Sequence, residues 1–238
     1  MHHFFMKAHF LSLLAGTTLL LAGACARSST ADIERPSARG TTAETDAGAS
    51  VPSSSGSSAY IDPAARKTAP DHRKDIKLAD ATLEAEPRNV EALLMRARAK
   101  SELKDYKAAM VDYNAAIQLE PTNSNVYYNR GLNRLETKDY SGAILDFGKA
   151  TKYNPQDRDA FFGRGSAKMQ IFNYRSAIPD FTKAIALDPN YADAYEYRGI
   201  SYASINKFKE ARIDLEKAAQ LNPAAEKSLR RYVGNKDK

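Results

Sequence analysis

Apolar and small side chains recur at a fixed interval of 34 residues between residues 90 and 225. In each 34-residue unit an aromatic residue opens the second half, and a large apolar residue follows seven positions later on the same helical face. Small residues hold three other positions, where they let helices approach closely. The recurring residues are Tyr106, Tyr140, Tyr174 and Phe208; Tyr113, Phe147, Phe181 and Leu215; Ala97, Gly131, Gly165 and Gly199; Ala109, Ala143, Ala177 and Ala211; and Ala116, Ala150, Ala184 and Ala218.

A proline closes each unit, and another precedes the first unit. Because proline disfavours helical geometry at the residue before it, each unit is predicted to hold two helices, of which the second ends there. Asp105, Asp139 and Asn173 precede the second helix, where a short polar side chain caps the first-turn N–H groups. Lys207 takes that position in the fourth unit without offering a cap, although Asn206 tolerates a left-handed turn. The prolines are Pro87, Pro121, Pro155, Pro189 and Pro223.

These residues resemble the tetratricopeptide repeat, which has small residues, an aromatic and a proline at the same positions of a 34-residue unit. The tryptophan that is common in the fourth position of the family is missing. The resemblance implies an all-α fold, a right-handed α-solenoid of four helix-turn-helix repeats with a concave groove lined by the first helix of each pair. The four repeats are residues 90–123, 124–157, 158–191 and 192–225.

Both ends of the repeat array are predicted to carry an extra helix, because an open stack needs its terminal core faces covered. Residues 73–86, within a leading segment 71–89, form a degenerate half-repeat with Ile76, Leu78, Ala79 and Leu83 as its apolar positions. Residues 224–233 form a capping helix that buries Leu229, Tyr232 and Val233. This helix and the tail that follows it make up the C-terminal segment 226–238. Within the array, Pro179 lies about one turn into its helix, so a slight kink is expected there.

The first 24 residues have the pattern of a signal peptide: Lys7 precedes an apolar run that is too short to span a bilayer. The start lies at Met1 or Met6. Cys25, the only cysteine, follows directly and resembles a bacterial lipoprotein processing site, which implies lipid attached at Cys25. Ordinary secretory cleavage close to Cys25 is the alternative to lipoprotein processing and stays open. Residues 25–70 are rich in Ser, Thr, Ala, Gly and Pro and predict a disordered linker.

Four Arg–Asp pairs share one spacing of 16 residues, which places both members at the same level of a helix hairpin. We expect partly exposed ion pairs that hold the hairpins together and stabilise them modestly. A binding ladder of arginines is the alternative interpretation. The pairs are Arg96 with Asp112, Arg130 with Asp146, Arg164 with Asp180, and Arg198 with Asp214.

The positions that line the concave groove in the family hold acidic and apolar residues here, although the whole chain carries a formal charge of +6. The excess Lys and Arg is therefore expected on the outer face and in both tails. Such a groove fits a peptide or helix with apolar anchors and positive charge, and it has the wrong sign for nucleic acid. The alternative stays open that neighbouring first helices bury these apolar groove residues between them. The candidate groove residues are Leu94, Arg98, Tyr128, Leu132, Leu135, Phe162, Met169, Glu196 and Ile200.

No pattern in the sequence indicates catalysis. It has no glycine-rich phosphate loop and no metal-ligand spacing, so we expect neither an enzyme, nor a cofactor, nor a metal. The leading hypothesis is a protein-binding scaffold, lipid-anchored at the periplasmic face of the bacterial outer membrane and assisting an envelope complex. A soluble secreted or periplasmic adaptor is the alternative, and a basic surface protein that binds anionic polymer or membrane is a third. The partner's identity and a homodimer stay open.

Overall fold

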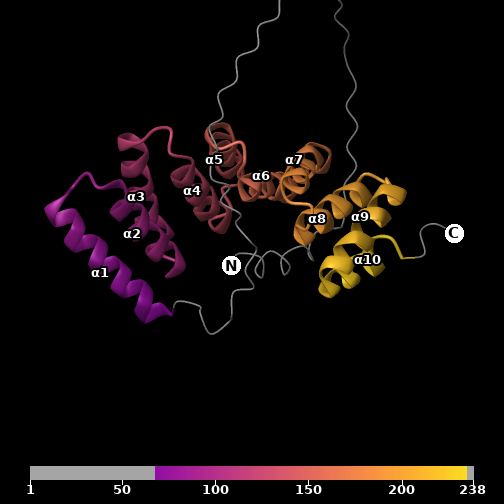
Figure 1. The fold of residues 1–238 in the computed structure, drawn as a ribbon, viewed down its shortest axis with the longest axis horizontal. Helices are drawn as coiled ribbons and strands as arrows, with labels where there is room; N and C mark the ends of the chain where they lie inside the picture. The colour runs from indigo at the N-terminus through magenta and orange to yellow at the C-terminus, as the bar shows by residue number, and fades with distance from the viewer. Residues whose placement is uncertain (1–67, 235–238) are drawn as a thin grey trace, which may run out of the picture. The chain divides into compact units, whose positions relative to one another are not determined.

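Helices α2 to α9 form four consecutive hairpins, one in each 34-residue unit. The structure, a computed structural model, describes residues 68–234, and Figure 1 shows these helices following one another along the chain. The predicted all-α repeat solenoid is thereby confirmed. The helices are α1 (Ala69–Ala85), α2 (Val90–Glu102), α3 (Tyr106–Leu119), α4 (Ser124–Glu136), α5 (Tyr140–Tyr153), α6 (Arg158–Gln170), α7 (Tyr174–Leu187), α8 (Ala192–Ser204), α9 (Phe208–Leu221), the 3-10 turn η2 (Pro223–Ala225) and α10 (Glu226–Tyr232).

The second helix of every unit ends two residues before its proline, as the sequence predicts. The residue between helix and proline is extended in each case, for example Glu120 with φ −128° and ψ 80°. This is the geometry that a following proline enforces. Helix α7 continues through Pro179, which lies beyond its first turn.

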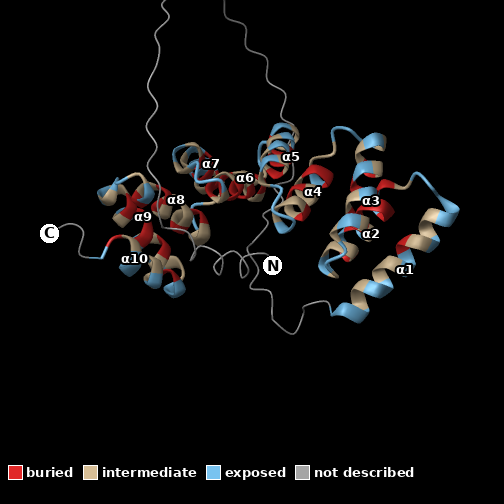
Figure 2. Cartoon of the chain, turned by 180° about the vertical axis from the view of Figure 1, so that it is seen from behind, coloured by how far each residue is buried: buried red, intermediate tan, exposed pale blue. Residues whose placement is uncertain are grey.

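The recurring small and aromatic residues form the core between hairpins (Figure 2). Phe147 of α5 is fully buried, and its ring edge lies where a Cβ on Gly131 or Gly163 would stand, at 3.0 and 2.7 Å respectively. Helices α4 and α6 therefore both approach this ring closely because each carries a glycine there. Gly165 makes the same room for Phe181 in the next unit.

Caps at the second helices follow the prediction. Asp105, Asp139 and Asn173 accept hydrogen bonds from the backbone N–H groups of the third helical residue, whereas Lys207 makes no side-chain cap. The turn before each cap contains a left-handed residue in every unit, not only at the expected Asn206. Glycine would fit these four positions best, so three of the turns keep a side chain that the conformation disfavours. These left-handed residues are Lys104, Lys138, Phe172 and Asn206.

We expect Lys207→Asp to stabilise the fold, because it supplies the missing cap at α9. A Ser, Thr, Asn or Asp cap is worth about 1 kcal/mol, so the free energy of unfolding should rise by about that amount in urea titrations. Lys207→Ala is the control, since it removes the Lys207–Glu210 ion pair without adding a cap. Equal stability of the Asp and Ala variants would contradict the assignment.

The four predicted Arg–Asp pairs all form, with two hydrogen bonds each. Arg130, for example, donates from Nη2 to Asp146 Oδ1 at 2.6 Å and from Nε to Oδ2 at 2.9 Å. The expected partial exposure is wrong for the aspartates, because Asp146 is 1% exposed and its three equivalents are also buried. Each aspartate lies against the arginine of the first helix in its own hairpin and is buried there, so these are not surface ion pairs.

The arginines also connect successive hairpins. Arg96 donates to Asp80 of α1 at 2.8 Å, Arg130 to Asn114 at 2.7 Å and Arg198 to Thr182 at 3.1 Å, each partner lying 16 residues earlier. In the third unit that position is Gly148, and Arg164 reaches Thr151 instead. The arginines therefore bridge the second helices of neighbouring units, which favours the structural interpretation over a binding ladder.

Helix α1 stands where the second helix of a preceding unit would lie, since Asp80 occupies the position of Asn114 one unit earlier. It begins at Ala69, before the expected start, because the Asp71 carboxylate accepts hydrogen bonds from the N–H and hydroxyl groups of Thr68. Ala79 is buried and Leu83 packs on the first core, but Leu78 is 60% exposed, so its expected place in the core is wrong.

Helix α10 covers the last hairpin as expected. Val233 is fully buried, and Leu229 and Tyr232 pack against the same cluster as Leu215. The Ser228 hydroxyl donates to Glu196 Oε1 at 2.6 Å, which ties α10 to α8. Among the helices of residues 69–232, we find none both long and apolar enough to span a bilayer.

Candidate functional site

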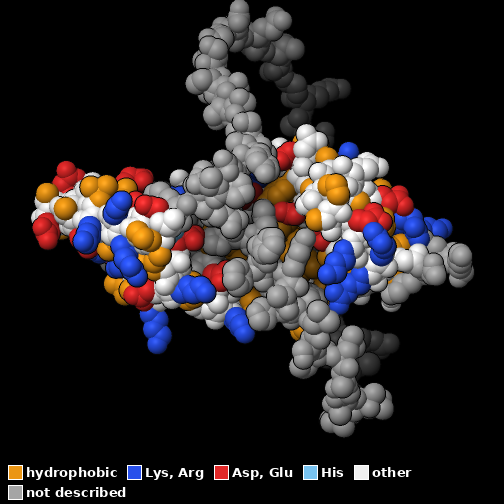
Figure 3. Space-filling view, turned by 90° about the horizontal axis from the view of Figure 1, so that it is seen from below, with side chains coloured by type: hydrophobic (Ala, Val, Ile, Leu, Met, Phe, Trp, Pro, Cys, Tyr) orange, Lys and Arg blue, Asp and Glu red, His pale blue; other side chains and the backbone are white. Residues whose placement is uncertain are grey.

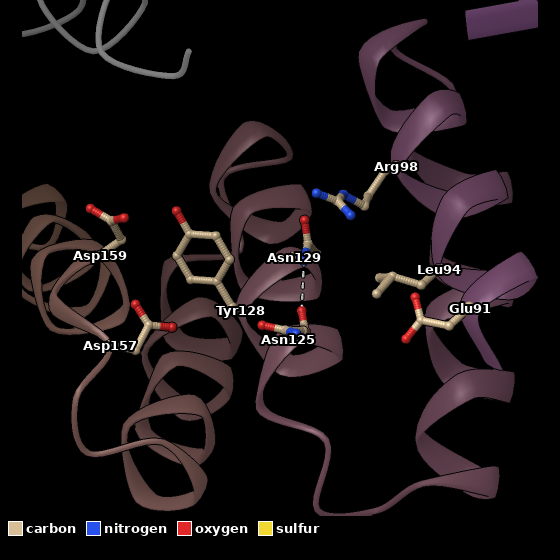
Figure 4. Close-up of a pocket in the computed structure, with 8 residues that line it drawn as sticks. All are labelled: Glu91, Leu94, Arg98, Asn125, Tyr128, Asn129, Asp157 and Asp159. Carbon is tan, nitrogen blue, oxygen red and sulfur yellow. Dashed lines mark hydrogen bonds between the residues drawn. The ribbon is translucent and has the colours of Figure 1, made fainter. Parts of the chain in front are cut away.

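A pocket of about 310 Å³ lies where the first helices α2 and α4 meet the start of α6 (Figure 4). The first helices are the ones from which the sequence predicts the groove. The pocket brings together three of the predicted groove residues, Leu94, Arg98 and Tyr128, with further polar residues from all three elements. Its lining is Glu91, Leu94, Arg98, Asn125, Tyr128, Asn129, Asp157 and Asp159.

Negative charge dominates the pocket, since three carboxylates face it together with one guanidinium. Figure 4 shows Tyr128 between the two aspartates of the α6 start and the asparagines of α4. Figure 3, which views the molecule from below, likewise shows acidic side chains beside apolar surface. The arrangement therefore offers a cationic group several oxygen acceptors and an aromatic ring.

Hydrogen bonds from α6 and from the residue that precedes α8 hold the two aspartates in place. Asp157 is the N-cap of α6 and accepts from the Ala160 N–H at 2.9 Å. Asp159 accepts from the Tyr191 hydroxyl at 2.9 Å and lies 3.7 Å from the Arg158 guanidinium. Both carboxylates are thus positioned before any partner arrives, which lowers the entropy cost of binding.

Burial raises the pKa of Asp157 above its ordinary value, and the negative charge of Asp159 adds to this, while the hydrogen bond from Ala160 acts against it. Burial also raises the pKa of the Tyr128 hydroxyl, with Asp159 and Asp157 contributing, so this hydroxyl stays protonated. Burial makes the charged form of this carboxylate less stable, so a cation brought close to it stabilises that form.

The other predicted groove residues lie in the core rather than in the pocket. Phe162 and Met169 belong to one buried cluster with Phe181, and Leu94, which also lines the pocket, is 3% exposed. Leu132 and Leu135 pack on the cluster around Phe147, and Ile200 packs on the last two clusters. Most of the apolar stripe is therefore used in packing the first helices together.

Glu196 is a second departure from the predicted groove, because it is 2% exposed and accepts the hydrogen bond from Ser228. Its contact with α10 gives it a structural role at the end of the array. Arg98, by contrast, is exposed at the pocket.

Glu91, Asn125 and Asp159 also lie at the family's groove positions, whereas sequence reasoning missed the pocket residues Asn129 and Asp157. Asn129 donates from its side chain to the Asn125 carbonyl at 2.7 Å. Asp157 stands one residue before its helix, outside the family's groove positions. Its place before α6 is a cap signal, and a search for caps on the first helices would have found it.

Three family models match separate parts of the array. One described as "TPR repeat" matches residues 97–136, and two described as "Tetratricopeptide repeat" match residues 124–157 and 167–226. The chain belongs to the tetratricopeptide-repeat family. Repeats of this family serve as protein–protein interaction scaffolds and are generally not enzymes, so this tetratricopeptide-repeat chain is an interaction scaffold.

Solved structures of tetratricopeptide-repeat proteins share the fold. The crystal structure of MamA is 24% identical over 71% of this chain and 99% of that chain, with a TM-score of 0.62. A MamA fragment from Desulfovibrio magneticus RS-1 is 21% identical over 65% and 87%, with a TM-score of 0.60. YrrB, described as "a TPR protein with an unusual peptide-binding site", is 19% identical over 68% and 85%, with a TM-score of 0.61.

At these identities the likeness establishes the fold alone. No curated protein matches the chain. Among residues 68–234 no group of three or more His, Cys, Asp or Glu side chains is arranged to hold a metal ion.

Proposed function

We propose that the chain captures a segment of a partner protein that places a Lys or Arg side chain into the pocket between α2, α4 and the start of α6. The observation that carries this proposal is that Asp157 and Asp159 beside Tyr128, and Glu91 on α2 across from them, line one pocket (Figure 4). An ammonium or guanidinium group there would meet carboxylate oxygens and the face of an aromatic ring. Apolar neighbours in the segment would pack near Leu94.

A peptide is the favoured class of ligand because the pocket is open, shallow and built from repeated helices. The printed description of YrrB gives that protein a peptide-binding site on a similar fold. An acidic pocket also disfavours nucleic acid, whose phosphates would be repelled. Recognition of a short segment by a few anchors is the usual mode for such a groove.

We expect Asp157→Asn to weaken binding of a basic apolar peptide about tenfold, since one charge-assisted contact worth about 1.4 kcal/mol is lost. Asparagine caps helices as well as aspartate, so α6 keeps its N-cap and the change isolates the charge. The probe is a fluorescein-labelled peptide of alternating Leu and Lys, titrated by fluorescence anisotropy.

Glu216→Gln on α9 removes the same kind of charge away from the pocket and is the matched control. A labelled peptide of alternating Leu and Glu tests the sign of the charge. The proposal fails if that acidic peptide binds as tightly as the basic one, or if Asp157→Asn and Glu216→Gln behave alike.

Binding of the Leu–Lys peptide should also depend on pH. Asp157 is charged above its raised pKa, so its contribution to binding is lost as the pH falls through that pKa. Anisotropy titrations at decreasing pH should show weaker binding for the wild type. Asp157→Asn should show a flatter profile, while far-UV circular dichroism verifies that both remain folded.

The finer proposal concerns localisation and rests on Cys25, which lies outside the described residues, as do the predicted signal peptide and residues 25–67 of the predicted linker. Residues 69 and 70 of that segment belong to α1. The apolar run before Cys25 and its place at the end of that run support a lipid-anchored protein of the bacterial outer membrane that assists an envelope complex. Ala26 and Arg27, rather than Asp, follow the cysteine, which favours the outer membrane as the place of the anchor. A soluble secreted or periplasmic adaptor is the alternative.

We expect Cys25→Ser to abolish labelling by a fatty-acid analogue and to release the protein from membrane fractions washed with high salt, which screens attraction between basic side chains and anionic lipid. Thr122→Ser, in the exposed turn between α3 and α4, serves as a control that leaves Cys25 intact. If the Cys25→Ser protein is normally processed and still fractionates wholly with membranes, the anchor proposal is wrong and another attachment must hold the protein there.

A further inference from the structure

Exposed apolar side chains recur at one position of the second helices, on the side of the hairpins away from the buried core. Val111, Leu145 and Ile213 are 67%, 68% and 67% exposed, and the exposed Pro179 takes the same position in the third unit. These residues are spaced by 34, so each hairpin contributes one of them. Folding gains little from apolar side chains left in water, and a repeated row of them marks a surface for contact.

Positive charge surrounds this row. Helices α3, α5, α7 and α9 each expose the residue four positions before the row and the residue seven positions after it. We name the exposed residues of these four helices the outer face. Its charged residues are six basic ones, Lys107, Lys149, Lys152, Arg175, Lys183 and Lys209, and one acidic one, Glu216.

We propose that the outer face docks onto an anionic lipid surface. A bilayer interface rich in anionic lipid attracts Lys and Arg and also accepts aliphatic side chains, so it matches both features at once. The long lysine stems add apolar contact while their ammonium groups stay at the phosphates. The proposal concerns a different surface from the peptide pocket and does not depend on a lipid at Cys25.

Other polyanions fit this face less well. Single-stranded nucleic acid binds through aromatic side chains that stack on bases, whereas the row consists of aliphatic residues and a proline. The pocket on the first helices carries the opposite charge, so an anionic surface would be repelled from it. Docking through the outer face would thus leave the pocket facing the aqueous side, where a partner can reach it.

A tryptophan reporter tests the proposal cleanly, because the chain contains no tryptophan. Leu145→Trp places the reporter in the row, and Thr122→Trp places it in the exposed turn between α3 and α4, away from the outer face. The full chain is incubated with phosphatidylethanolamine–phosphatidylglycerol vesicles that contain a lipid with brominated acyl chains. Emission at Leu145→Trp should shift to the blue and be quenched, while Thr122→Trp should stay unquenched.

Two further comparisons separate charge from general membrane attachment. Lys149→Gln with Lys152→Gln, introduced beside the reporter, should lower the ratio of quenched to unquenched protein about 25-fold, because each basic residue near an anionic surface contributes about fivefold. Vesicles of phosphatidylcholine alone should give little quenching.

The proposal is overturned if both reporters are quenched equally, if Leu145→Trp stays unquenched, or if neutral vesicles quench it as strongly. It is also overturned if heparin alone shifts its emission as far as the vesicles do, which would assign the face to anionic polymers. Loss of fatty-acid labelling at Cys25 would leave the result unaffected, so this test is independent of the anchor.

Discussion

Asp146→Asn is expected to destabilise the repeat array by about 3 kcal/mol, because it leaves two arginines without their buried counter-charge. Asp146 is 1% exposed, and both of its oxygens accept from Arg130, while Arg134 Nη1 lies 3.0 Å from Oδ2. Both guanidinium groups are mostly covered by neighbouring helices. The asparagine keeps the shape of the side chain, but it removes the charge and replaces one acceptor oxygen by an NH2 donor that cannot pair with a guanidinium.

Because Arg134 is a second cation beside Asp146, the expected loss of stability is larger than for an aspartate that pairs with one arginine. Lys100 and Lys168 stand in the equivalent places beside Asp112 and Asp180, at 2.7 Å in both cases. In the fourth unit this place is taken by Tyr202, so Asp214 faces Arg198 alone. We therefore expect Asp214→Asn to cost about half as much as Asp146→Asn.

Asp139→Asn is the matched control for this experiment. It lies on the same hairpin and makes the same chemical change at an exposed cap, where asparagine substitutes well, so its effect should stay within about 0.5 kcal/mol. Urea unfolding followed by circular dichroism measures all three variants. If Asp146→Asn lies within about 1 kcal/mol of Asp139→Asn, the buried ion triad is not a major source of stability.

The contrast between these aspartates also shows what the sequence could predict. The 34-residue period located every hairpin, the caps of three second helices and every Arg–Asp pair, because each of these depends on local spacing. Burial of Asp146 depends instead on how tightly the side chains around it pack in three dimensions, and the spacing of residues along the sequence carries no information about that packing. The expected exposure of the pairs was wrong for this reason.

The candidate site was predictable in part for the same reason. Leu94, Arg98 and Tyr128 follow from family groove positions, whereas Phe162 and Met169 occupy equivalent positions but turn into the core. Which residues of a stripe stay open depends on the distances between first helices, and those distances are set by the side chains of three elements together. The exposed row on the outer face was visible in the sequence as a further position that repeats every 34 residues. Apolar periodicity alone, however, indicates core packing rather than an exposed surface.

Gly163→Ala is expected to destabilise the array by about 2 kcal/mol, although alanine normally favours a helix over glycine by about 1 kcal/mol. A Cβ at this position would lie 2.7 Å from the ring edge of Phe147, closer than side chains tolerate. The ring cannot retreat, because it is fully buried and the same edge faces Gly131 at 3.0 Å. The overpacking cost of about 3 kcal/mol should therefore exceed the gain in helix propensity.

Gly148→Ala makes the same change on α5 with the opposite expected sign. A Cβ there would meet only Arg164 Nη1, at an ordinary contact distance of 3.9 Å, so the variant should gain about 1 kcal/mol of stability. Phe147→Leu in the Gly163→Ala background should recover part of the loss, since a smaller side chain relieves the contact. Equal signs for the two glycine variants in urea unfolding would mean that α6 can move away from α5. The spacing of the first helices, and with it the pocket between α2, α4 and α6, would then depend on something other than the ring of Phe147.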